Sequence, residues 1–260
     1  MSFLEHLEEL RWHIVRSAVS ILVFAIIAFI FYRFLFDFVL LAPKNPDFIT
    51  NRLLCRFAEF INSPHLCINK VALQIQNINI AGQFSATIMV SLYTGLVIAF
   101  PYVVWELWRF ITPALYENER KYARGSVAAI SIMFFIGALF GYFIIVPLSI
   151  NFLGGWTVSA DVETVVDLAS YLTIVYIPFA TGIVFELPIL MVFLARVGII
   201  TPDFMAKYRK HAIIVLMTLS AIITPPDIFS MMLVVMPLIL MYEISIILTK
   251  RIVKKQKVNT

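Results

Sequence analysis

Six long apolar segments divide this chain of 260 residues, and its basic residues gather in alternate gaps between them. Of the 20 Lys and Arg residues, fifteen lie at the two ends and in the second and fourth gaps: Arg11, Arg16, Arg109, Arg120, Lys121, Arg124, Arg196, Lys207, Arg209, Lys210, Lys250, Arg251, Lys254, Lys255 and Lys257. The other five surround the first gap, and the third and fifth gaps hold none. Loops rich in Lys and Arg stay on the cytoplasmic side of a membrane. The pattern therefore predicts an all-α integral membrane protein with six transmembrane helices and both termini in the cytoplasm.

The composition excludes an ordinary soluble domain. Hydrophobic residues make up 61% of the chain and its mean hydropathy is +0.93, more than a soluble domain of this size needs. The pI of about 9.1 does not indicate a nucleic-acid partner, because the charges flank apolar segments instead of forming one stripe with interleaved aromatic residues. We interpret them as determinants of topology and as contacts to anionic lipid. The chain starts with acidic residues, Glu5, Glu8 and Glu9, where a cleavable signal peptide would be basic, so we expect none.

The six expected helices differ in length. They cover about residues 14–36, 83–105, 126–150, 168–195, 211–224 and 228–243. The fifth has about fourteen residues, which rise roughly 21 Å, whereas a hydrocarbon core is about 30 Å thick. The sixth meets Glu243 after about sixteen residues, so we expect helices 5 and 6 both to be short. Between them Pro225 and Pro226 end one helix and Asp227 is a good N-cap for the next, which predicts a tight outer turn.

We interpret residues 1–260 as a single six-span membrane domain with three surface segments. Residues 1–13 are predicted to form an amphipathic helix at the cytoplasmic interface, because apolar residues recur there at helical spacing. Residues 250–260 are predicted to be a basic cytoplasmic tail, and residues 37–82 a long outer loop with Pro43 at a turn.

Within the outer loop, one stretch has the spacing of an amphipathic helix. Apolar residues recur every four positions, with charged residues on another face: Ile49, Leu53, Phe57 and Ile61 against Arg52, Arg56 and Glu59. This helix either lies on the outer membrane surface or packs on the protein itself, and the sequence leaves both open. Cys55 and Cys67 both fall in this loop, on the oxidising side, so a disulfide is expected, with free thiols as the alternative.

Glu186 is the costliest residue within the apolar segments. A carboxylate at mid-span costs about 2.5–3.5 kcal/mol on insertion scales, so it should face protein or water. Pro188 follows two residues later, bends the helix and frees backbone carbonyls. We interpret Glu186 as a polar lining on a concave face. A protonated Glu that is hydrogen-bonded between helices is the alternative.

Carboxylates also gather where the first helix begins and the second ends. Three precede the first helix and three follow the second: Glu5, Glu8 and Glu9, then Glu106, Glu117 and Glu119. Antiparallel neighbouring helices would bring these ends together, and the carboxylates could then receive guanidinium groups through bidentate, charge-assisted bonds. The alternative is local pairing with the chain's own basic residues, such as Arg11 and Arg120.

The chain carries no catalytic signature. Its four His residues are scattered, no His, Cys and Asp cluster has metal-ligand spacing, and no phosphate-binding loop or nucleophile elbow is present. We therefore expect no enzyme activity, no metal and no cofactor. A secondary transporter that uses Glu186 as a proton relay is the competing class, and the absence of inverted repeats argues against it.

Four motifs resemble, in the right order, those of one membrane-protein family. They are Ser2–Arg11, Phe110–Arg120, Phe185–Pro188 and Thr224–Asp227. The first contains the motif residues His6, Leu7, Leu10 and Arg11. Together the motifs resemble the TatC family, the polytopic subunit of the twin-arginine protein translocase.

The resemblance implies a receptor for signal peptides with paired arginines and the core subunit of a translocase that exports folded proteins with the proton-motive force. It implies that Phe110, Glu119 and Glu9 form the recognition surface. The neighbouring loop residues assigned to the same surface are Pro113, Leu115, Tyr116 and Arg120. It further implies a glove-like arrangement of helices with Glu186 on its concave face.

The same resemblance implies partners and a location. We expect single-span TatA- and TatB-like subunits, self-association in a receptor complex, contact with membrane lipid and no nucleic acid. The location implied is the cell inner membrane. The first outer loop is longer than is usual in the family, so the resemblance carries little about contacts on that side.

Overall fold

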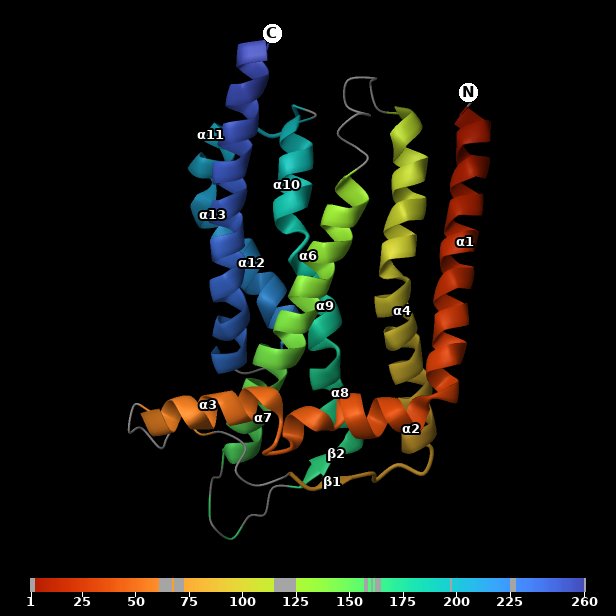
Figure 1. The fold of residues 1–260 in the computed structure, drawn as a ribbon, viewed down its shortest axis with the longest axis vertical. Coiled ribbons are helices and arrows are strands. Elements are labelled where there is room, and N and C mark those ends of the chain that lie inside the picture. Colours follow the sequence, from red (N-terminus) through yellow and green to blue (C-terminus); the bar gives the residue numbers. More distant parts are fainter. Residues whose placement is uncertain are drawn as a thin grey trace. The chain divides into compact units, whose positions relative to one another are not determined.

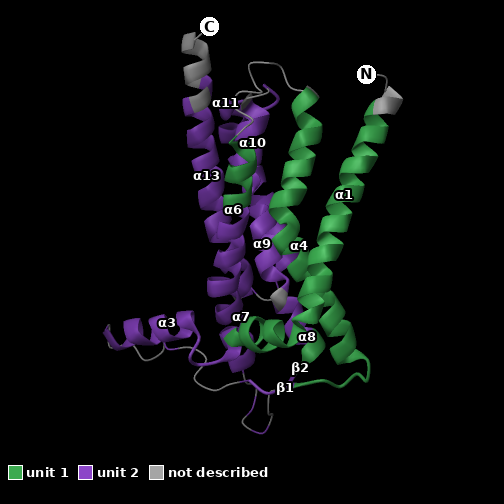
Figure 2. Cartoon of the chain, turned by 45° about the vertical axis from the view of Figure 1, so that its right-hand side comes forward, with its two compact units in different colours: residues 1–42, 76–132, 167–169 green, residues 43–75, 133–166, 170–260 purple. Residues whose placement is uncertain are grey.

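The computed structural model describes residues 3–60, 67, 73–114, 125–156, 159, 161, 165–196, 198–224 and 228–259, and these are mostly helical (Figure 1). The chain divides into two compact units (Figure 2). Unit 1 comprises Met1–Ala42, Gln76–Ile132 and Asp167–Ala169, and unit 2 comprises Pro43–Ile75, Met133–Val166 and Ser170–Thr260.

Among the described residues, five helical stretches are long and apolar enough to cross a membrane. They are His6–Ile30, Gly82–Ile111, Ser126–Gly155, Leu168–Ala195 and Ser230–Arg251. These correspond to five of the six helices expected from the sequence. The remaining one, expected at 211–224, is helix α12 (Arg209–Ile223), whose 15 residues agree with the prediction of a short helix.

Unit 1 is built on two long helices, α1 (Phe3–Ile30) and α4 (Gly82–Ile111). The stretch predicted as an amphipathic helix, residues 1–13, is helical from Phe3 and runs into the first spanning helix without a break. The physical reason is that no Gly or Pro occurs between Phe3 and Ile30, so nothing in the backbone interrupts the helix. Pro101 lies inside α4 without ending it, and a short 3-10 turn, η4 (Thr112–Ala114), follows α4.

The two helices of unit 1 approach closely at Gly95. A Cβ atom at this position would lie 2.6 Å from the backbone nitrogen of Ala25 and 2.8 Å from its Cα. Backbone atoms cannot move aside as a flexible side chain can, so the contact requires a residue without a side chain. The small residue therefore sets the distance between α1 and α4.

We predict that Gly95→Ala destabilises unit 1 by about 1–3 kcal/mol, because the added methyl group overpacks the helix contact. Thermal unfolding in detergent, followed by circular dichroism, measures the effect. Gly125→Ala is the matched control, since a Cβ atom at Gly125 meets nothing within 4 Å. Equal unfolding midpoints for both variants would contradict the close contact.

In unit 2, helix α6 (Ser126–Phe140, whose first residues belong to unit 1) continues through the π-helical turn η5 (Gly141–Ile145) into α7 (Val146–Gly155). The next apolar stretch is broken twice, into α8 (Leu168–Val175), α9 (Ile177–Val184) and α10 (Leu187–Arg196).

Each break precedes a proline. Pro178 is the second residue of α9, and Pro188 is the second residue of α10. A proline has no N–H for the carbonyl four residues earlier, so the preceding helix ends and a new one starts with proline in its first turn. The second break leaves Glu186 in a turn between α9 and α10.

Glycines also allow close packing of α6 and η5 against α9. A Cβ atom at Gly137 would lie 2.7 Å from the Phe185 side chain, and one at Gly182 would lie 2.7 Å from the Phe134 ring. Between them the buried Thr181 hydroxyl donates to the Gly137 carbonyl at 3.0 Å or to the Ile177 carbonyl of its own helix at 2.9 Å. This contact holds the residues just before Glu186 firmly against α6.

The last helices of unit 2 are α11 (Pro202–Lys207), α12 and α13 (Ile228–Asn259). The prediction that helix 6 is short is wrong for the helix as a whole, since α13 has 32 residues. Glu243 does not end it, because its carboxylate is exposed and pairs with Arg209 of α12 at 3.0 Å. The Lys-rich segment beyond has good helix propensity, so the helix continues into the expected basic tail.

Several short elements follow α1, the first of them within the predicted first helix and most of the rest in the predicted outer loop. After α1 come α2 (Tyr32–Phe34), the π-helical turn η1 (Leu35–Leu40) and the 3-10 turn η2 (Ala42–Lys44). Helix α3 (Ile49–Phe60) confirms the helix expected from the four-residue spacing. Strands β1 (Ile75–Gln76) and β2 (Val166–Asp167), which the sequence analysis did not predict, pair in a two-stranded sheet.

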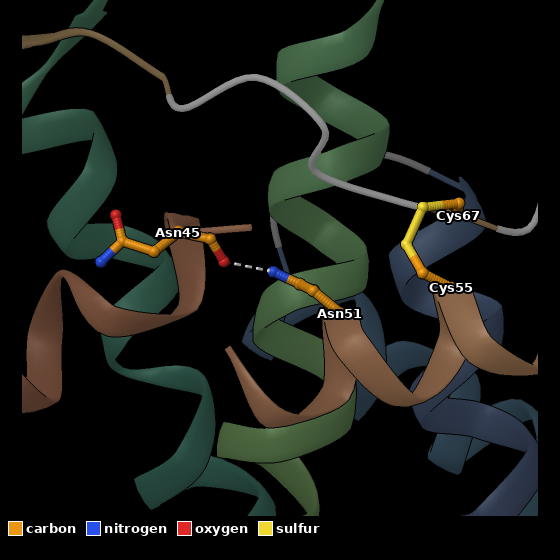
Figure 3. Close-up of a disulfide and its surroundings, with 4 residues drawn as sticks. All are labelled: Asn45, Asn51, Cys55 and Cys67. Carbon is orange, nitrogen blue, oxygen red and sulfur yellow. Dashed lines mark hydrogen bonds between the residues drawn. A yellow bond between two sulfur atoms is a disulfide. The ribbon is translucent and has the colours of Figure 1, made fainter. Parts of the chain in front are cut away.

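Polar contacts near its start and a disulfide at its middle hold α3. The Asn51 amide donates to the Asn45 carbonyl at 2.8 Å (Figure 3). It also donates to the carbonyl of Pro43, which lies in η2, at 3.3 Å. In the middle of α3, Cys55 forms a disulfide with Cys67 (Figure 3). The loop that contains both cysteines is therefore a defined structure over its described residues.

Candidate functional site

The N-terminal motif and the start of the second motif, Phe110–Arg120, meet in unit 1. The ring of His6 on α1 stacks on Phe110, near the end of α4, with centroids 4.4 Å apart and planes inclined by 19°. The His13 ring contacts the same Phe110 edge-on at 6.0 Å. Two histidines seven residues apart lie on one helix face, so α1 holds the aromatic ring between them.

Next to this aromatic contact lies a polar cluster in which His13 and Glu106 are buried and Tyr102 is exposed. His13 Nδ1 pairs with Glu106 Oε2, and the Tyr102 hydroxyl donates to Glu106 Oε1 at 2.8 Å. His13 is 5% exposed and Glu106 only 1%. Because both carboxylate oxygens have partners, the cluster ties α1 to α4 next to Phe110.

The structure corrects one part of the expected acidic rim. Glu106 does not face the solvent with the other carboxylates, because it is buried and bound to His13 and Tyr102. Glu106 therefore pairs within the chain, as the alternative reading of the acidic rim expects. Its partner is His13 and not an arginine or a lysine. Glu8 is exposed and Glu9 is half-buried.

Glu9 lies on the face of α1 that contacts α4. It follows His6 by three residues and precedes His13 by four, and residues at these spacings share a helix face. Of the other motif residues, Leu10 is half-buried, whereas Leu7 and Arg11 are exposed. The Arg11 guanidinium lies over the ring of Trp12, 5.8 Å from its centroid.

Only the first part of the predicted loop site falls within the described residues. Pro113 is exposed in η4, where the Thr112 hydroxyl donates to the Trp108 carbonyl at 2.6 Å and closes the end of α4. The predicted site residues that lie outside the described residues are Leu115, Tyr116, Glu119 and Arg120. The same holds for the predicted outer-turn residues Pro225, Pro226 and Asp227.

In unit 2, Glu186 occupies the turn between α9 and α10 and is half-buried. Its Oε1 atom is buried and has no hydrogen-bond partner in the part of the chain that the structure describes. An unpaired buried acceptor destabilises a fold unless another group or water satisfies it. A polar lining on a concave face therefore stays a prediction for Glu186, with a protonated carboxyl hydrogen-bonded between helices as the alternative.

His13, Tyr102 and Glu106 form a cluster that is not predicted above from the sequence. Tyr102 and Glu106 are four residues apart and so share a face of α4. His13 follows His6 by seven residues, which places both on the same face of α1. A carboxylate and a histidine at facing ends of two apolar helices are the signal that predicts such a pair, since neither is stable alone in an apolar contact.

Over the described ranges, no group of three or more His, Cys, Asp or Glu side chains is arranged to hold a metal ion. The arrangement in unit 1 is instead one of aromatic rings, carboxylates and exposed basic side chains.

Comparison with known proteins agrees with this organisation. The chain matches the family model described as Sec-independent protein translocase protein (TatC) over residues 5–237. It is 37% identical over 259 residues to TatC of Blattabacterium sp. subsp. Periplaneta americana, covering 98% of this chain and 97% of that protein. It is 33% identical over 264 residues to TatC of Aquifex aeolicus, covering 99% and 98%.

A solved structure is similar as well. The crystal structure of the twin-arginine translocase receptor TatC superposes with a TM-score of 0.75 and 32% sequence identity, covering 94% of this chain and 98% of that chain.

The fold and these matches define a multi-pass helical membrane protein of a protein-translocation system. The chain belongs to the TatC family, whose members are components of the Sec-independent, twin-arginine protein translocase. It is therefore a transport component and not an enzyme, and membership of this family sets aside the competing class of secondary transporter.

Proposed function

We propose that this protein is the receptor for twin-arginine signal peptides and the core subunit of a translocase that exports folded proteins with the proton-motive force. In this proposal the chain crosses the inner membrane six times with both termini in the cytoplasm. The alternation of basic loops supports this orientation. TatA- and TatB-like single-span subunits and further copies of the chain are the proposed partners.

The observation that carries the proposal is the contact between the two motifs in unit 1. Phe110 is held by His6 and His13 on the face of α1 that also bears Glu9. A carboxylate beside an aromatic ring can bind an arginine. The planar guanidinium donates two parallel hydrogen bonds to a carboxylate and also stacks on an aromatic ring. We propose that Glu9 binds one guanidinium of the signal peptide and that Glu119 binds the other.

The apolar part of the signal peptide then follows a path past Glu186. This part of the proposal is supported by the unpaired Oε1 of that residue, which leaves an acceptor for a ligand, for water or for a partner. The loop residues Pro113, Leu115, Tyr116 and Arg120 are proposed to shape the same surface.

Crosslinking of a signal peptide to the full-length protein in membranes tests the recognition step. We expect Glu119→Ala to reduce capture of a paired-arginine peptide by on the order of tenfold, which corresponds to about 1.4 kcal/mol, and Glu119→Arg to reduce it further. A peptide with two lysines, at the same salt concentration, should bind the parent protein more weakly, because lysine cannot form a bidentate bond.

Glu59→Ala is the matched control for this experiment. Glu59 is an exposed carboxylate on α3, so its loss changes the net charge equally without touching the proposed site. If the Glu119 and Glu59 variants capture the peptide equally well, the proposed role of Glu119 is wrong.

A further inference from the structure

Helix α3 presents three different faces. One face is buried or half-buried in unit 2 and includes Asn51 and Ala58. A second face is apolar and exposed: Ile49 57%, Leu53 60%, Phe57 53% and Phe60 86%. The third is charged and exposed, with Arg52, Arg56 and Glu59. One helix with a protein face, an apolar face and a basic face has the pattern of a helix that lies in a lipid interface.

The residues just before and at the start of α3 attach it to η5, within the third apolar stretch Ser126–Gly155. The buried Phe48 ring stacks on Phe143, with centroids 5.6 Å apart and planes inclined by 14°, and meets Tyr142 edge-on at 5.6 Å. The Thr50 hydroxyl donates to the Phe143 carbonyl. These contacts all lie within unit 2 and at η5.

The position of this attachment along the stretch gives its depth. Phe143 follows Ser126, the first residue after the basic loop, by seventeen residues. At 1.5 Å per residue the separation is about 25 Å, and a hydrocarbon core is about 30 Å thick. The attachment therefore lies near the edge of the hydrocarbon core, on the side away from that basic loop.

The direction of α3 agrees with this depth. In both views α3 runs across the direction of α13, which belongs to the same unit (Figures 1 and 2). With 12 residues, or about 18 Å, α3 is too short to cross a membrane. A helix that runs across the spanning direction at the edge of the core lies in the plane of the interface.

We propose that α3 is an interfacial anchor whose apolar face, formed by Ile49, Leu53, Phe57 and Phe60, is seated among the acyl chains of the membrane. The exposed Arg52 and Arg56 lie at the level of the headgroups, where their charges favour anionic phosphate. The Cys55–Cys67 disulfide links α3 to a later position in the same loop. With the orientation proposed above, the leaflet involved is the outer one.

A photoreactive phenylalanine analogue at position 57 tests this proposal. The full-length protein with benzoylphenylalanine in place of Phe57 is reconstituted into vesicles of phosphatidylethanolamine and phosphatidylglycerol, irradiated and analysed by mass spectrometry. We expect adducts with lipid acyl chains. A second probe at Leu53, on the same face, should give the same result.

The matched control carries the probe at Glu59, on the charged face of the same helix, and should give several-fold fewer acyl adducts. Adducts that join position 57 to another protein chain would overturn the proposal in favour of a protein interface. Equal lipid labelling at positions 57 and 59 would overturn it as well, because α3 would then have no fixed orientation. The readout needs no signal peptide, so it stands or fails independently of the proposed receptor function.

Discussion

Replacing Glu106 by alanine is expected to destabilise the protein and to reduce capture of the signal peptide together. The change leaves His13 buried without its acceptor and removes the partner of the Tyr102 hydroxyl. Removing one member of a buried pair costs about 3 kcal/mol or more, because the group left behind is desolvated and unpaired. Thermal unfolding in detergent and signal-peptide crosslinking measure the two effects.

The double variant His13→Leu with Glu106→Leu separates stability from recognition. Replacing both members of a buried pair by apolar residues is often neutral for stability. We therefore expect the double variant to recover most of the unfolding free energy. We expect it not to recover peptide capture, because the His13 ring no longer holds Phe110 from one side. Full recovery of capture would instead mean that the pair only stabilises the fold.

The exposed pair between Arg209 and Glu243 is the control for this measurement. Its side chains are well exposed and 3.0 Å apart, and exposed pairs of this kind contribute about 0–1 kcal/mol. Glu243→Ala should therefore shift the unfolding midpoint much less than Glu106→Ala. A shift of equal size would contradict the assignment of Glu106 to a buried, structurally coupled cluster.

The sequence predicts most of the helices because their signals are local. Runs of apolar residues bounded by charge define α4, α6 and α8, and the four-residue spacing defines α3. The break at Glu186 follows from Pro188 in the same way, since a proline acts on the carbonyl four residues earlier.

The features that the sequence did not predict depend on contacts between distant residues. His13 and Glu106 are 93 positions apart, so their pairing depends on which helix ends lie side by side and not on a local spacing. The β1–β2 pair likewise joins segments about ninety residues apart, and each strand has only two residues. Two-residue strands carry no alternating pattern, so periodicity cannot reveal them.

The extra length of α1 and α13 has a common cause. Polar residues precede the apolar stretch that starts at Ile14, and Glu243 follows the apolar stretch of α13, but neither ends its helix. Helix continuity depends on the backbone propensity of the residues and not on the hydrophobicity of each position. Both α1 and α13 therefore extend beyond the apolar stretch that defines the spanning segment.

Replacing Glu186 by leucine is expected to stabilise unit 2 and to abolish export. The Oε1 atom of Glu186 is buried without a hydrogen-bond partner among the residues described, and an unpaired buried acceptor costs about 1–3 kcal/mol. Leucine fills a similar volume and removes this cost, so the unfolding midpoint should rise. Export of a reporter should be lost, because the acceptor proposed to line the path of the signal peptide is gone.

Thr181→Val is the control for Glu186→Leu, because it is expected to lower the unfolding midpoint where Glu186→Leu raises it. The Thr181 hydroxyl is buried within reach of the Gly137 and Ile177 carbonyls, and valine has the same shape without the hydroxyl. Its loss should lower the unfolding midpoint while the carboxylate at Glu186 remains. Packing alone favours an apolar side chain at position 186. If Glu186 destabilises the fold and is still required for export, its role is therefore functional. If Glu186→Leu lowered the midpoint as Thr181→Val does, Glu186 would be a packing residue, and its proposed place on the path of the signal peptide would be wrong.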